Sequence, residues 1–174
     1  DVKLPPGWQN VTLKVKDDSG STSTYSRDIR IAGLVYNEDL QNITGSQDGV
    51  EFTVTNQYSE EIVIERILID PENDGIDELE ESTVDHEIEI YGDWTGYVEF
   101  YDYLDIPNQG TIVEINEEGN ENGGNVPLGA GHTATVQLRD FDANMIGEDI
   151  TIGLRYGIDG SYDAAVFSDE VDSR

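Results

Sequence analysis

The chain has 174 residues, of which 38 are Asp or Glu and nine are Lys or Arg, so its formal net charge is −29. Nucleic acids and anionic membrane surfaces are not expected as partners, because phosphate binding needs clustered positive charge. The chain contains no cysteine, which excludes disulfides and thiol chemistry. No apolar run approaches the roughly 18 residues of a membrane span, and the sequence shows no signal peptide.

The acidic residues are distributed unevenly. Residues 1–33 contain five bases and four acids, a net charge of +1, whereas residues 34–174 contain four bases and 34 acids, a net charge of −30. Such an acidic part repels itself at physiological salt, but at ~1 M salt the Debye length is roughly 3 Å and most of the repulsion is screened. We therefore expect a separate segment at 1–33, an acidic domain at 34–174 and an extremely halophilic host, since the composition resembles that of haloarchaeal proteins.

Apolar residues recur at every second position along most of the chain, and this period predicts β-strands. In chain order, we predict strands at 10–16, 22–31, 34–43, 49–56, 61–69, 86–91, 96–104, 110–116, 132–141, 148–158 and 162–168. Polar turns such as 17–20 and 46–49 separate them, and one short helix is predicted at 76–82. We expect an all-β fold, a β-sandwich or jelly roll of antiparallel strands with an N-terminal hairpin or donor strand.

The alternation also predicts which side chains face the core. Val50, Phe52 and Val54 should point to one side of their strand. Residues 61–69 are apolar on both faces, which predicts a central strand that is covered on both sides. Residues 117–125 contain no apolar side chain and are predicted to form a loop.

The first two predicted strands form a hairpin. Its apolar residues alternate with polar ones that include Lys14 and Lys16. An extended terminal segment of this kind can complete the sheet of a neighbouring molecule through main-chain hydrogen bonds, and the two lysines would then contact an acidic sibling. The alternative is that the hairpin packs on its own body.

The acidic stretch at 70–81 has the spacing of an EF-hand-like calcium loop, with Gly75 at the turn. The expected oxygen ligands are Asp70, Glu72, Asp74, Ile76 (through its carbonyl), Glu78 and Glu81. The stretch departs from the EF-hand pattern in having Glu at the third loop position and no strong flanking helices. Because a chain this acidic produces such spacings by chance, a solvated loop is the alternative to calcium binding.

Two further features of the sequence are predicted to lie on the protein surface: N-glycosylation sequons and an aromatic-rich stretch. Asn10 and Asn42 begin N-glycosylation sequons, which predicts surface glycans if the protein is secreted. Further along, the stretch at 90–104 is rich in aromatic residues. Tyr97, Tyr101 and Tyr103 should share one strand face, and Trp94 should lie in the preceding turn. Such a row can contact another subunit, stack on sugar rings, or pack beneath a neighbouring loop or sheet.

No catalytic signature is present in the sequence. The two histidines, His86 and His132, are not accompanied by a recognisable nucleophile motif, and the chain has no phosphate-binding loop, dinucleotide fingerprint or zinc spacing. With 38 acids, any chosen pair of carboxylates is uninformative. We predict that the protein is not an enzyme.

Two family resemblances complete the sequence-based expectation. The segment GWQNVTLKVKDDSGSTSTYSRDIRI, at 7–31, resembles the final two strands of PKD-type extracellular domains. VEFTVTNQYSEEIVIERILIDP, LGAGHTATVQLRDF and ITIGLRYGIDGS resemble the β-sandwich outer domains of haloarchaeal surface and pilin-like proteins. Pilins carry an apolar N-terminal helix that forms the filament core. No such helix is present here, so either it was removed or this protein assembles differently.

These resemblances imply an extracellular structural subunit, of a filament or a cell-surface layer, that binds copies of itself. The alternatives are an accessory module of a larger secreted protein that binds carbohydrate or another ligand, and a structural protein of a virus that infects a halophile.

Overall fold

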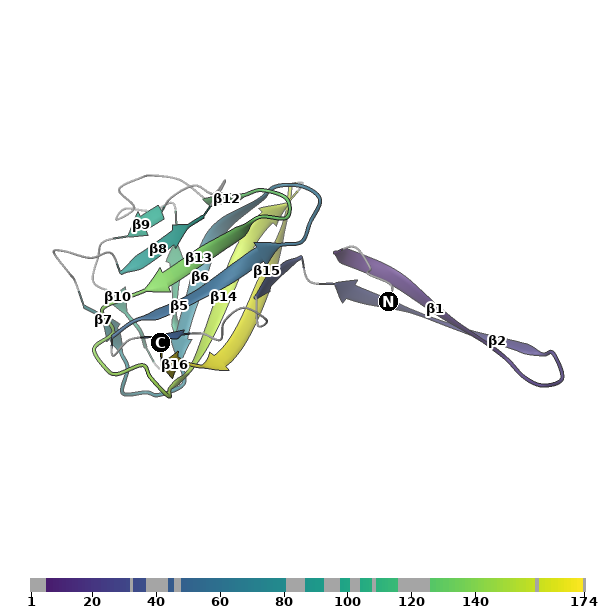
Figure 1. Cartoon of the computed structure of the whole chain (residues 1–174), viewed down its shortest axis with the longest axis horizontal. Helices are drawn as coiled ribbons and strands as arrows, with labels where there is room; N and C mark the ends of the chain where they lie inside the picture. Colours follow the sequence, from purple (N-terminus) through teal and green to yellow (C-terminus); the bar gives the residue numbers. More distant parts are fainter. Residues whose placement is uncertain are drawn as a thin grey trace. The chain divides into compact units, whose positions relative to one another are not determined.

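The computed structural model describes residues 6–31, 33–36, 44–45, 48–80, 87–92, 98–100, 104–107, 109–115, 126–158 and 160–173. In these ranges the regular structure consists of β-strands, most of them antiparallel, and the fold is an all-β sandwich (Figure 1). No described segment forms a helix with the length and hydropathy needed to cross a bilayer. The chain divides into two compact units, Asp1–Gly33 and Leu34–Arg174.

The first unit is a hairpin of β1 (Gly7–Lys16) and β2 (Thr22–Ile31), with Leu13 opposite Tyr25. Asp17 closes its turn, because one of its carboxylate oxygens accepts hydrogen bonds from the Ser19 hydroxyl (2.7 Å) and the Ser21 amide (2.8 Å). The Ser19 hydroxyl, together with nearby backbone amides, holds the pKa of Asp17 below its ordinary value. The turn is therefore stabilised above the acidic range and loses this contribution as the pH falls.

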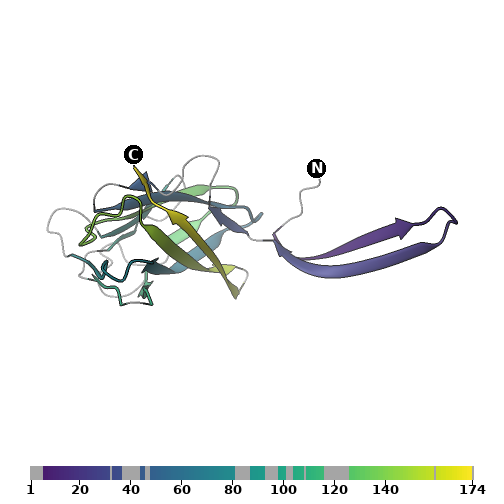
Figure 2. The ribbon, with the colours of Figure 1, turned by 90° about the horizontal axis from the view of Figure 1, so that it is seen from below.

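The second unit contains two main sheets (Figure 2). The five-stranded sheet has the order β11-β6-β14-β15, with β12 also paired to β6. Its strands are β6 (Ile62–Pro71), β11 (Thr111–Glu114), β12 (Val126–Leu128), β14 (Asp149–Ile158) and β15 (Ser161–Glu170). The long antiparallel partners β6, β14 and β15 form a continuous platform of ten-residue strands.

The seven-stranded sheet has the order β16-β4-β5-β13-β8-β9, with β3 also paired to β5. Its strands are β3 (Leu34–Tyr36), β4 (Thr44–Gly45), β5 (Val50–Asn56), β8 (Ile88–Tyr91), β9 (Val98–Phe100), β13 (Thr133–Leu138) and β16 (Asp172–Ser173). The pairing of β16 with β4 is parallel. A separate two-stranded sheet joins β7 (Glu78–Leu79) to β10 (Leu104–Asp105).

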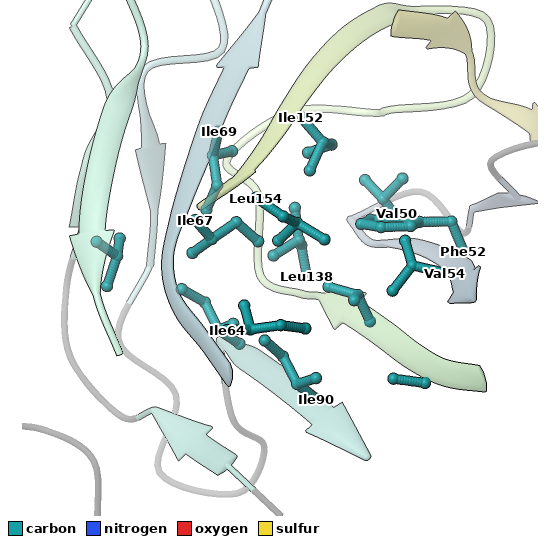
Figure 3. Close-up of a cluster of buried hydrophobic side chains, with 14 of the residues drawn as sticks. Val50, Phe52, Val54, Ile64, Ile67, Ile69, Ile90, Leu138, Ile152 and Leu154 are labelled. Atoms are coloured by element: carbon teal, nitrogen blue, oxygen red, sulfur yellow. The ribbon is translucent and has the colours of Figure 1, made fainter. Parts of the chain in front are cut away.

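The core contains the inward-facing side chains of the two main sheets, which Figure 3 shows pointing toward one another. The predicted inward set of β5 is confirmed, since Val50, Phe52 and Val54 are buried. Aromatic contacts join the sheets near β15, where the rings of Tyr36 and Phe167 stack with centroids 5.2 Å apart. Each buried aliphatic side chain contributes about 1.5–3 kcal/mol relative to its exposed state.

Two sequence predictions about elements are wrong. The helix predicted at 76–82 is not formed over the described residues 76–80, because their backbone groups bond to other segments. The Ile106 amide donates to the Asp77 carbonyl, and the Glu80 amide donates to the Asp140 carbonyl. The strand predicted at 61–69 is central, but its outer face has no second layer in the described part of the chain. The loop predicted at 117–125 lies outside the described residues.

Candidate interaction surfaces

The hairpin has one apolar face and one polar face. Side chains of residues directly opposite each other share a face, so Val11, Leu13, Val15 and Tyr25 lie together. Their exposed fractions are 39, 61, 54 and 65% respectively. We call these four residues the hairpin ridge. A two-stranded sheet has no second layer of its own, and a lone hairpin is only marginally stable in water. The hairpin ridge is therefore a surface suited to a partner.

The predicted interface lysines and the first sequon lie on the polar face of the hairpin. Asn10, Lys14 and Lys16 alternate with the ridge residues along β1. The Asn10 side-chain amide donates to Asp28 Oδ1 at 2.7 Å, and both side chains are exposed. A glycan at Asn10 would therefore project away from the hairpin ridge. Glycosylation of Asn10 remains a prediction.

A second apolar surface lies on the outer side of the five-stranded sheet. The strand register places Ile112, Leu68, Gly153 and Val166 in one row across β11, β6, β14 and β15. We call these four residues the outer row. Ile112 and Val166 are 63 and 64% exposed, and a hollow of about 190 Å³ opens along the row. Gly153 forms its floor, since a Cβ there would lie 3.1 Å from Leu68 Cβ.

The outer row is flanked by two of the four bases of residues 34–174. Arg66 and Arg155 are direct cross-strand partners on β6 and β14. Arg66 forms an ion pair with Glu114 (2.5 Å), and the Arg155 guanidinium lies over the Tyr162 ring, 4.2 Å from its centroid. Exposed aliphatic, tyrosine and arginine side chains together are typical of protein contact surfaces. Two of the four bases of residues 34–174 therefore lie beside an apolar row.

The flanks of the outer row carry carboxylates. In the neighbouring row on one side, Asp70 lies next to Thr151 and Ser168. On the other side, beyond the two arginines, an open hollow of about 340 Å³ is lined by residues that include Glu61, Glu65 and Tyr162. The outer face is thus apolar at its centre, positive on one side of the row and negative further out.

The outer face of the other sheet is different in character. Gln137 contacts Glu51 on β5, and its Nε2 donates to the Tyr91 hydroxyl at 3.0 Å. Arg139 forms an ion pair with Glu89 (3.3 Å), whose residue is 8% exposed. These polar side chains bind one another across β5, β13 and β8. The described part of this face therefore lacks an apolar row comparable to the one on the five-stranded sheet.

The free edge of β15 is protected by its own side chains. The Ala164 amide donates to Asp163 Oδ1 (2.7 Å), and the Glu170 amide donates to Asp169 Oδ1 (3.0 Å). The other carboxylate oxygens of these two aspartates accept hydrogen bonds from the hydroxyls of Tyr58 (3.2 Å) and Tyr36 (3.3 Å). Capped amides and charged side chains that point toward the core are features that oppose edge-to-edge pairing.

The predicted calcium loop has ordinary turn and strand geometry. Asp70 belongs to β6, opposite Thr151. A turn follows, in which the Ile76 amide donates to the Asn73 carbonyl at 2.9 Å. Of the predicted ligands, Glu81 lies outside the described residues. In the ranges that the structure describes, no three metal-ligating side chains converge. Calcium binding by this loop remains a prediction.

Two carboxylates that the loop pattern did not identify lie together nearby. Loss of solvent and then the charge of Asp77 raise the pKa of Asp142 above its ordinary value. The Asp142 amide donates to the Glu78 carbonyl at 3.3 Å, which links the segment after β13 to β7. This proximity could not be predicted, because the two acids are 65 positions apart in a chain rich in acids.

Asn42, Trp94, Tyr97, Tyr101, Tyr103 and His86 lie outside the described residues. The predictions of an aromatic contact row, a second glycan and no enzymatic activity therefore remain predictions.

Sequence reasoning did not identify the outer row or its flanking arginines. The available signal was the two-sided apolar pattern at 61–69, which we interpreted as a strand covered on both faces. The position of Arg66 and Arg155 on adjacent strands depends on the register of β6 and β14, including a bulge next to Arg155. Register across distant strands cannot be obtained from alternation alone.

Comparisons with known proteins add no family assignment. No protein-family model matches the chain, and no curated protein matches it.

Proposed function

We propose that the protein is a structural subunit of an extracellular assembly of a halophilic archaeon, a pilus-like filament or a surface layer, in which copies associate through the hairpin. The observation that carries this proposal is the hairpin ridge. It exposes Leu13 and Tyr25 by more than half on a two-stranded sheet. Exposed contiguous apolar surface of this kind is typical of a protein contact site.

The charge distribution supports the same role. The unit at 1–33 has a net charge of +1 and the unit at 34–174 a net charge of −30, so the hairpin can approach a sibling without adding to the repulsion. In brine the acidic body remains soluble while the repulsion between bodies is screened. High salt thus favours both folding and association, as a subunit exposed to the medium requires.

The test compares the native chain with two double variants at multimolar NaCl. Leu13→Ser with Tyr25→Ser removes the centre of the hairpin ridge. The matched control, Lys14→Ser with Thr24→Ser, changes the next cross-strand pair, which lies on the opposite face. Light scattering and negative-stain electron microscopy should show fibres or sheets for the native chain and the control, but isolated particles for the ridge variant. A native chain that stays monomeric across the salt range would refute the proposal.

A second candidate function is a ligand-binding module of a larger secreted protein. It is favoured by the hollow of about 340 Å³, where Tyr162 and the carboxylates of Glu61 and Glu65 surround Gly157. Tyrosine rings and carboxylates are suited to stacking on and hydrogen bonding to sugars. Isolated particles that bind oligosaccharides at high salt, with binding lost in Tyr162→Ala, would favour this function over assembly.

A further inference from the structure

We infer that the outer face of the five-stranded sheet binds the hairpin of a second copy of this chain, with β1 lying across the sheet along the outer row. This inference rests on the proposed function and specifies its contact. Both surfaces are apolar and unpartnered in the described residues, and the hairpin belongs to a unit with a net charge of +1, against −30 for residues 34–174. Each can cover the apolar side chains of the other.

The dimensions of the two surfaces agree. Along β1 the hairpin ridge runs from Val11 to Val15, a distance of four residue steps, which is about 13 Å at ~3.3 Å per step. The outer row crosses three strand spacings, from Ile112 to Val166, which is about 14 Å at ~4.8 Å per spacing. The match requires the hairpin strands to run nearly perpendicular to the sheet strands, which is one of the two common ways in which sheets pack.

Charge selects the direction of β1. Arg27 lies opposite Val11, on the apolar face of the hairpin. Suppose that β1 runs from Ile112 toward Val166 with the hairpin ridge facing the sheet. The chirality of the strands then fixes the side of β1 on which β2 lies, and this side is over the row of Asp70. Arg27 therefore faces the Asp70 carboxylate. The reverse direction places β2 over Arg66 and Arg155, where Arg27 would be repelled. We therefore assign Val11 to the Ile112 end and Val15 to the Val166 end.

The two arginines of the face have a role in the assigned direction. They lie along the edge of β1 that is not paired to β2, and the unpaired carbonyls of that edge can accept hydrogen bonds from guanidinium groups. The capped edge of β15 disfavours addition of the hairpin as a further strand.

Unless two copies exchange hairpins reciprocally, a hairpin-to-face contact leaves an unused hairpin or an unused face on each copy at the ends of the assembly. Such a heterologous contact closes into a ring or continues as a filament, depending on the rotation between copies. A single contact type can therefore build the extended assembly of the proposed function.

The absence of native cysteine allows a direct test by cross-linking. Single variants Val11→Cys and Val15→Cys on the hairpin are each mixed at high salt with Ile112→Cys and Val166→Cys, one partner bearing a size tag. After treatment with a short bismaleimide, Val11→Cys should cross-link to Ile112→Cys, and Val15→Cys to Val166→Cys. Val11→Cys with Val166→Cys, and Val15→Cys with Ile112→Cys, should give cross-linking yields several-fold lower than the two assigned pairings. Lys14→Cys, on the polar face of the hairpin, is the matched control and should give little product.

Several results would overturn the inference. Equal yields from all pairings would show that the contact has no fixed direction, and a dominant Lys14→Cys product would show that the other hairpin face is used. A chain carrying both Val11→Cys and Ile112→Cys that cross-links only within itself would show that the contact is not between copies. If fibres form without the assigned cross-links, this inference fails and the proposed function stands. If the native chain is monomeric throughout, both fail.

Discussion

At the scale of single residues, Asn56 is the best example of a polar group that organises the fold. It ends β5 and is fully buried. Its side-chain amide donates to the carbonyls of Glu60 (2.9 Å), Leu128 (2.9 Å) and Gly129 (3.1 Å), and its side-chain oxygen accepts from the Tyr58 amide (2.9 Å). One side chain thus joins the turn after β5 to the end of β12, a strand of the other sheet.

Asn56→Asp should be strongly destabilising, because it replaces the donor nitrogen with an oxygen that faces the same three carbonyls. An unsatisfied buried polar group costs about 1–3 kcal/mol, so we expect a loss of roughly 2–4 kcal/mol in the free energy of unfolding. Urea denaturation at high salt, followed by circular dichroism, measures this loss. The matched control is Thr55→Asn, at a partly exposed position whose side chain points to the other side of β5. An Asn56→Asp variant as stable as the native chain would show that the three carbonyls do not depend on this amide.

Sequence predicts such residues only in part. The alternation along 50–56 assigned Val50, Phe52 and Val54 to the core, because a half-buried strand repeats every two residues. It did not single out Asn56, and it could not identify the three carbonyls that the Asn56 side chain binds. Those carbonyls belong to segments that come together only after both sheets have formed.

At the scale of elements, the strands were predictable where both period and length were clear. The strand predicted at 22–31 agrees with β2, and those at 49–56 and 148–158 agree with β5 and β14 to within one residue at each end. The two-residue strands β7 and β16 were not predicted, because two residues carry no period. The helix at 76–82 was predicted from acidic composition, whereas the backbone groups of Asp77 and Glu80 bond to other segments and Glu78–Leu79 forms β7.

The capped edge of β15 leads to a prediction at this scale. Asp163→Ala with Asp169→Ala should leave the Ala164 and Glu170 amides free on the sheet edge and promote edge-to-edge association. Loss of the accepted hydrogen bonds should also lower the free energy of unfolding by about 0.5–1.5 kcal/mol at each site. Asp163→Asn with Asp169→Asn is the matched control, since the retained side-chain oxygen can still accept from the amide. Dynamic light scattering should detect irregular aggregates in the Ala variant alone, and equal behaviour of the two variants would argue against a capping role.

At the scale of the whole molecule, charge determines the conditions in which the fold exists. The −30 body has an apolar core formed by both sheets, so in its folded state many carboxylates share a limited surface. Composition alone predicts this repulsion and its screening by salt. It does not predict that the hairpin and the outer face of the five-stranded sheet expose apolar side chains, because that depends on strand register.

The native structure should therefore be lost when salt is removed. At about 10 mM salt the Debye length is roughly 30 Å, and most pairs of carboxylates on the body then repel one another. We expect the far-ultraviolet circular dichroism signal of the sandwich to disappear between multimolar and millimolar NaCl, and to return when salt is restored. Salt can act by screening the carboxylates or by strengthening the burial of apolar surface. Dilution into sucrose solution separates these two effects, because sucrose is excluded from the protein surface and favours compact states but does not screen charge. If sucrose alone preserves the fold, burial rather than screening limits stability; if the spectrum is unchanged in millimolar salt, the acidic surface is not an adaptation to brine.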